Sequence, residues 1–150
     1  MQFIDARDAA AWMLDQAEAR RSGAFNLCGP NTPLTMGALL AAMCATLGAT
    51  LGTSARLTWV DDAFLLAQGV APWSELPLWL PQAQAGLHRM NIERALANGL
   101  RCRPLAQTLA DTAAWAGSTD INATGAGPPR PPVGLTPERE AALLAARHTR

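Results

Sequence analysis

The order of apolar and polar residues predicts an alternation of helices and short strands along the chain. The clearest helix covers residues 35–47, where apolar residues recur at the i, i+3, i+4 and i+7 spacing of one helix face. Thr35 suits its N-cap and Gly48 its C-cap. Two apolar runs that lack this spacing, 24–28 and 56–60, favour strands. The apolar face of the predicted helix consists of Met36, Leu39, Leu40, Met43, Cys44 and Leu47.

Further helices are predicted from their start and stop residues. The first follows a short apolar run at 2–4 and begins at Asp5 or Asp8, because an acidic cap suits a helix N-terminus. It ends in the arginines before Gly23. Three shorter helices are expected at 63–68, 92–97 and 104–115.

The segment 72–81 predicts an irregular loop. Its prolines break helix and strand alike, since proline lacks a backbone donor and fixes its own φ angle. The loop nevertheless carries Trp73 and Trp79. Such large rings are expected to bury against the core, a ligand or a partner.

Composition changes abruptly after residue 117, where glycine, serine, threonine and proline dominate. We therefore predict an α/β domain over 1–117, a Pro/Gly-rich linker over 118–134 and a tail helix over 135–150. Burial of the tail's three leucines would be nearly offset by the entropy cost of ordering it, so we expect marginal docking and a dispensable tail.

Composition and charge exclude several classes of function. Hydrophobic residues make up 49% of the 150 residues and charged residues 16%, which suits a folded domain. The twelve cations are all arginine and balance twelve acids, so neither nucleic acid nor an anionic membrane is an expected partner. Because the chain has no lysine and no tyrosine, chemistry that requires a Schiff-base lysine, a P-loop lysine or a tyrosine acid/base is excluded.

Cysteine usage and hydropathy predict a soluble, cytoplasmic protein without a metal site. Cys28, Cys44 and Cys102 are far apart and show no C-x-x-C spacing, and a buried reduced thiol is expected at Cys44. The pair Asp61–Asp62 is better explained as a helix N-terminus than as a metal or acid/base pair. No apolar run reaches the length of a membrane span, and the early charges argue against a signal peptide.

Four segments, taken in order, resemble motifs of one enzyme family. Residues 2–10 (QFIDARDAA) are similar to its Phe-Ile-His-Val-x-Asp-Leu-Ala motif, and residues 23–29 (GAFNLCG) to its Gly-x-Tyr-Asn-Leu-Gly strand. Thr35 and the helix after it resemble its capped helix, and residues 91–115 its closing Asp-x-Ser-Lys-Ala, Leu-Gly-Trp and proline pattern. This family is the NAD-dependent epimerase/dehydratases, or extended short-chain dehydrogenase/reductases. The Trp/Pro loop and the tail resemble its isoflavone-reductase-like subgroup.

The resemblance implies an α/β fold, namely the C-terminal substrate-binding portion of such an enzyme without its nucleotide-binding Rossmann half. Asp5, Phe25, Cys28 and Asn91 stand where the family usually has His, Tyr, Gly and Asp. The family's glycine-rich phosphate turn and its Tyr-x-x-x-Lys pair are missing from this sequence. The chain alone is therefore expected to contain no catalytic and no cofactor-binding residue and to be inactive, with NAD or NADP bound only in a full-length parent.

Six residues are candidates for contacts with a small-molecule substrate. In this interpretation Arg89 binds a carboxylate or phosphate, and Glu75 accepts a hydroxyl between two indoles. The competing interpretation is structural, with the indoles in the core and the charged side chains in solvent. The candidates are Trp73, Glu75, Trp79, His88, Arg89 and Asn91.

Two functions remain open at the level of sequence. In the first, the chain is the substrate-binding half of an NAD(P)-dependent oxidoreductase or epimerase, and its partner is the missing Rossmann half. In the second, it is a stand-alone protein-interaction module derived from that fold, which pairs through the Trp loop or the tail helix. Where the missing Rossmann half should dock, we expect an exposed apolar surface at the first helix and at the Trp loop.

Overall fold

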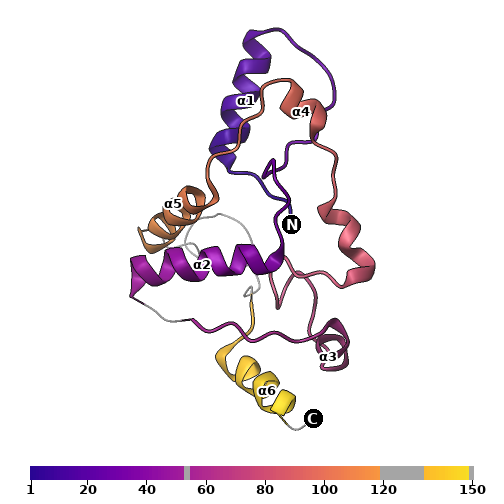
Figure 1. The fold of residues 1–150 in the computed structure, drawn as a ribbon, viewed down its shortest axis with the longest axis vertical. Helices are drawn as coiled ribbons and strands as arrows, with labels where there is room; N and C mark the ends of the chain where they lie inside the picture. Colours follow the sequence, from indigo (N-terminus) through magenta and orange to yellow (C-terminus); the bar gives the residue numbers. More distant parts are fainter. Residues whose placement is uncertain (53–54, 119–133, 149–150) are drawn as a thin grey trace, which may run out of the picture. The chain divides into compact units, whose positions relative to one another are not determined.

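A computed structural model describes residues 1–52, 55–118 and 134–148, and this part of the chain is mainly helical (Figure 1). Between α3 and α4 lies a 3-10 helix, Gln82–His88. None of the described helices is long and apolar enough to cross a membrane. The α-helices are α1 (Ala6–Glu18), α2 (Met36–Leu51), α3 (Asp62–Ala67), α4 (Glu93–Ala97), α5 (Leu105–Ser118) and α6 (Pro137–His148).

The predicted α/β fold, and with it the architecture of a short-chain dehydrogenase/reductase substrate-binding portion, is wrong for this structure. The segments 24–28 and 56–60 form no strand, and the β-pairing among the described residues consists of isolated bridges. Phe3 and Gly29 form one of these bridges through two backbone hydrogen bonds of 2.9 and 2.7 Å. A strand needs a neighbour along its length. The segment 24–28 has no such neighbour and instead directs apolar side chains toward a helix.

The chain divides into two compact units. Unit 1 comprises Met1–Leu57 and Gly86–Ile121, and unit 2 comprises Thr58–Ala85 and Asn122–Arg150. Apart from residues 118 and 134, the predicted linker lies outside the described residues.

In unit 1, α1 packs on α4 around Trp12. The indole is 5% exposed, donates from Nε1 to the Asn98 carbonyl at 3.0 Å and meets the Phe25 ring edge-on at 5.0 Å. Ala95 and Leu100 complete this small core. The guanidinium of Arg94 lies 4.5 Å from the centre of the Phe25 ring, on the outer side of the core.

A helix pair, α2 on α5, forms the rest of unit 1. The predicted N-cap is confirmed, because the Thr35 side chain accepts a hydrogen bond from the backbone of Ala38. The predicted C-cap at Gly48 is wrong, since α2 continues to Leu51 and ends where Gly52 adopts a left-handed φ of 64°. Leu39 on the predicted apolar face is only 2% exposed.

Unit 2 has a core of Phe64, Leu65, Val70 and Leu143. The first three lie in or just after α3, whose N-cap Asp61 accepts from the backbone of Phe64 at 2.6 Å. Leu143, on α6, is 6% exposed, so the tail helix supplies part of the core. The tail helix is thus packed in this structure, and the strength of its docking stays a prediction.

The segment 72–81 is confirmed as irregular, since it contains neither helix nor strand. Trp73 and Leu78 both have a φ of 66°, a conformation that is rare for residues with a side chain. The backbone of Trp73 donates to the carbonyl of Trp79 at 3.1 Å, which holds the two ends of the loop together.

Candidate functional site

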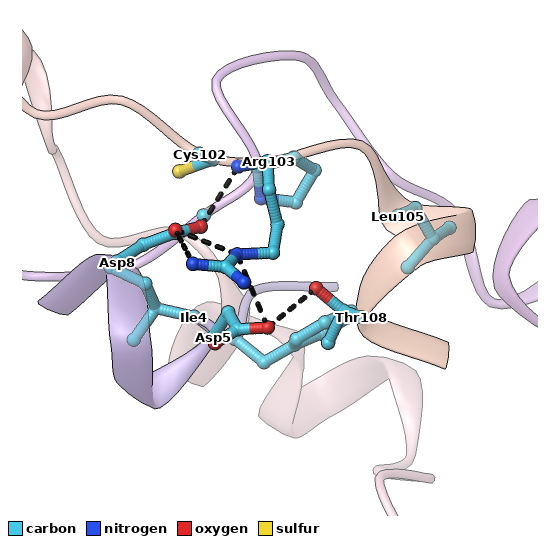
Figure 2. Close-up of a pocket in the computed structure, with 10 residues that line it drawn as sticks. Ile4, Asp5, Asp8, Cys102, Arg103, Leu105 and Thr108 are labelled. Carbon is cyan, nitrogen blue, oxygen red and sulfur yellow. Dashed lines mark hydrogen bonds and ion pairs between the residues drawn. The ribbon is translucent and has the colours of Figure 1, made fainter. Parts of the chain in front are cut away.

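The most densely charged place in the described structure is a cluster in unit 1, at the N-terminus of α1 (Figure 2). Asp8 faces Arg103, which lies just before α5. One carboxylate oxygen accepts from the Arg103 backbone at 2.8 Å, and the other contacts Nε at 2.8 Å and Nη2 at 2.7 Å. We call Asp5, Arg7, Asp8, Arg103 and Asp111 the charged cluster.

Asp5 connects the Asp8–Arg103 pair of this cluster with the Arg7–Asp111 pair. It caps α1 by accepting from the Arg7 backbone at 2.9 Å, and it also receives the hydroxyl of Thr108 on α5 at 2.9 Å. The Arg7 guanidinium binds Asp5 at 2.7 Å and reaches Asp111 on α5 at 2.7 Å. The cluster therefore ties the beginning of α1 to α5 by charge-assisted hydrogen bonds.

These contacts keep both central carboxylates ionised. The Arg7 side-chain hydrogen bonds hold the pKa of Asp5 far below its usual range, against the opposing effect of burial. The pKa of Asp8 is lowered chiefly by its hydrogen bonds with the Arg103 side chain. A carboxylate with a depressed pKa carries no proton to donate at neutral pH, so neither residue is suited to general acid catalysis.

The cavity on the Asp8–Arg103 side of the cluster is too small for a substrate. The cavity that Asp5, Asp8, Cys102 and Arg103 help to line holds about 30 Å³, enough for one or two water molecules (Figure 2). Burial raises the pKa of the Cys102 thiol, and the charge of Asp8 raises it further, so this thiol stays protonated and weakly nucleophilic.

A larger hollow of about 620 Å³ lies between α1 and α5, and we call it the α1–α5 groove. It is open along one side of unit 1 and combines apolar and charged side chains. Trp115, at its α5 side, is 55% exposed. Its lining residues are Phe3, Ile4, Asp5, Ala6, Arg7, Thr108, Asp111, Thr112 and Trp115.

The three cysteines among the described residues are free thiols, and no cluster of metal-ligating side chains accompanies them there. Cys28, Cys44 and Cys102 are free thiols, and burial raises the pKa of Cys28 as it does that of Cys102. The expected buried thiol at Cys44 is only half-buried. No group of three or more His, Cys, Asp or Glu side chains suited to a metal ion occurs in the part that the structure describes.

The three loop candidates for substrate contact lie in unit 2. Trp73 is 53% exposed, whereas Trp79 is half-buried and donates from Nε1 to Asp62 at 2.9 Å. Glu75 accepts from the backbone of Ala71 at 2.7 Å and lies 3.6 Å from Arg139 on α6. The Glu75 carboxylate thus already has structural partners, and its role toward a substrate stays a prediction.

The other three candidates lie in unit 1. His88 is half-buried beside a hollow of about 290 Å³, and Arg89 is exposed. Asn91 receives the backbone N–H of Glu93 at 2.8 Å and so helps to begin α4. The six candidates are therefore divided between the two units, three in each. Their substrate role also stays a prediction.

Sequence reasoning missed the charged cluster. It identified Asp5 and Asp8 only as alternative helix caps, whereas their side-chain partners Arg103 and Thr108 lie roughly a hundred residues away. The available signal was local and weak. Two acids stand three residues apart at the start of one helix, and an arginine precedes a proline at the start of another helix. Nothing in that pattern says which arginine pairs with which acid.

Comparison of the chain with protein-family models, with curated proteins and with solved structures found no match.

Proposed function

We propose that this chain is a protein-interaction module that binds another polypeptide through one face of α1. The observation that carries the proposal is an apolar stripe along this helix in which every residue is exposed. Leu14 is 65% exposed and Met13 54%. We call this surface the α1 stripe, and it consists of Ala6, Ala10, Met13, Leu14 and Ala17.

The stripe is a continuous surface and not a scatter of single residues. At about 100° per residue, its five members fall within roughly 100° of the helix circumference. Trp12 and Gln16 point to the other side, where they are 5% and 8% exposed. The helix is thus apolar on two faces, and unit 1 covers only one of them.

Exposure of such a stripe has an energetic consequence. Covering the exposed halves of Met13 and Leu14 would contribute about 2 kcal/mol, since full burial of such a side chain is worth about 1.5–3 kcal/mol. Single exposed apolar residues are common, but a contiguous apolar surface usually marks a binding site. In the charged cluster, in contrast, the carboxylates of Asp5 and Asp8 already bind Arg7 and Arg103.

The proposal is tested by photocrosslinking from the stripe. A benzophenone amino acid at position 14 in the full chain, irradiated in cells, is expected to give an adduct of discrete mass. The matched control places the same residue at Asp15, which is exposed on the same helix but faces away from the stripe. Equal adducts from both positions, or none from position 14, would refute the proposal.

A second candidate function is favoured by one observation. The segments that resemble the epimerase/dehydratase family contact one another in unit 1: Gly29 pairs with Phe3, Asn26 donates to the Asn91 carbonyl at 2.9 Å, and Asp8 binds Arg103. We propose, as the alternative, that the chain supplies substrate contacts to a nucleotide-binding half of an NAD(P)-dependent oxidoreductase or epimerase. This alternative concerns only the activity of the chain. It does not imply an α/β fold, which the structure contradicts.

The alternative makes its own prediction about cofactor binding. The chain alone is expected not to bind NADH, because the glycine-rich turn that cradles the pyrophosphate is missing from the sequence. NADH fluorescence titrated with the purified chain is expected to stay unchanged up to millimolar concentration. Saturable binding in the micromolar range would contradict this alternative, because it would reveal a nucleotide site in this chain.

A further inference from the structure

We infer that the polypeptide bound by the α1 stripe is a second copy of this chain, with the two α1 helices antiparallel. The inference rests on the proposed function and names its partner. A two-fold axis perpendicular to both helices would place the same stripe on each side of the contact, as a self-complementary interface requires. Three features support this arrangement: the side-chain sizes in the stripe, the charges on its flank and the groove at its end.

Side-chain size is the first match. In the register centred on residue 12, Leu14 of one copy faces Ala10 of the other. Met13 lies one residue from the level of Ala10, so both large side chains have a small alanine beside them. At each end of the stripe, Ala6 lies one residue from the level of Ala17. Large residues against small ones let the helix axes approach closely.

Charge is the second match. Arg7 and Glu18 flank the stripe on the same side, at opposite ends of the helix. In an antiparallel pair this flank meets its own copy. The register centred on residue 12 brings Arg7 within one residue, about 1.5 Å along the axis, of the level of Glu18 in the second copy, twice in the dimer. Both side chains are exposed, and Arg7 retains donors beyond those used for Asp5 and Asp111.

The α1–α5 groove is the third match, because it begins where the stripe ends. Ala6 belongs to both surfaces. The same register brings Arg20 and Arg21 of the second copy to the level of Ile4, beside Asp111 and Trp115 in the groove wall. Arginine is suited to both of these neighbours, through an ion pair with the carboxylate and by stacking on the indole.

The size of the contact determines the expected strength. A 13-residue helix is about 20 Å long, so two such helices and the groove ends bury less than a stable dimer usually requires. We therefore expect a weak dimer whose dissociation constant lies in the micromolar to high micromolar range.

Sedimentation velocity on the purified full chain tests the inference. The mass is expected to rise from 15.8 kDa toward twice that value as the concentration increases from about 5 to 500 μM. Leu14→Glu is expected to weaken association at least tenfold. The matched control Leu66→Glu makes the same change at an exposed leucine of unit 2 and is expected to weaken association by less than about twofold. Circular dichroism confirms that both variants retain their helices.

A second pair of variants tests the orientation of the helices. Glu18→Arg would place like charges opposite Arg7 and is expected to weaken the dimer about fivefold or more. Asp15→Arg makes the same change of charge on an exposed position that faces away from the stripe, and is expected to leave the dimer unchanged. Equal effects of Glu18→Arg and Asp15→Arg would overturn the antiparallel arrangement. Equal effects of Leu14→Glu and its control would overturn dimerisation through the stripe.

The outcomes separate this inference from the proposed function. If position 14 crosslinks in cells to a protein of another mass while the purified chain stays monomeric at every concentration, the interaction function stands and the self-association is wrong. If position 14 gives no adduct and the chain stays monomeric, both fail. An adduct of twice the chain mass, together with the Leu14→Glu effect, supports both.

Discussion

Leu143→Ala is expected to lower the free energy of unfolding of unit 2 by about 2–4 kcal/mol, the range for emptying a buried leucine site. Leu143 is 6% exposed and packs with Phe64, Leu65 and Val70. With a core this small, few neighbours can move in to fill the space. We therefore expect that much of unit 2 opens at 37 °C in the variant.

Hydrogen exchange of the segment 58–85, read by mass spectrometry, measures this loss without interference from unit 1. The matched control is Leu66→Ala, since Leu66 lies in the same unit but is 50% exposed. Its expected cost is below about 1 kcal/mol, in proportion to the smaller apolar area that it covers. Equal protection in the two variants would show that α6 is dispensable, as the sequence alone suggested.

Asp8→Asn is expected to lower the free energy of unfolding of unit 1 by about 1.5–3 kcal/mol. The carboxylate is 10% exposed and makes three contacts with Arg103, and the amide cannot accept all three. Partial solvation of the arginine side chain keeps the loss below that of a fully buried ion pair. Urea denaturation followed by circular dichroism measures it.

The effect of this substitution depends on pH in a defined direction. Because the folded-state pKa of Asp8 is lowered, its stabilisation is fully present above the unfolded-state pKa near 4 and decreases as the pH falls below that value. Wild type and Asp8→Asn should therefore differ most at pH 6–7, and the difference should shrink as the pH falls below about 4. A difference that stays constant down to pH 2 would show that the ion pair is not its source.

Asp15→Asn serves as the control for that experiment. Asp15 lies on the same helix and is exposed, so the same chemical change is made where no arginine contact is lost. Its expected effect is within about 0.5 kcal/mol at every pH. Comparable losses at both positions would indicate a general effect of charge on α1.

Local signals in the sequence predicted helices well and strands poorly. The caps at Thr35 and Asp61 depend on side chains that bond backbone groups within three residues, so the pattern alone was sufficient. The expected strand at 24–28 depended on a partner along its whole length, and the structure supplies one bridge at Gly29. The family resemblance carried the same expectation of a sheet and was wrong about it for the same reason.

The sequence by itself therefore determined where the helices begin, which face of 35–47 is apolar and that 72–81 is irregular. Only the tertiary structure decided that no sheet forms in the described residues, that Asp8 binds Arg103 and that Leu143 enters a core. The physical reason is the range of the interactions. Caps and helical periodicity act within a few residues, whereas ion pairs, core contacts and the exposed face of α1 depend on which distant segments fold back onto each helix.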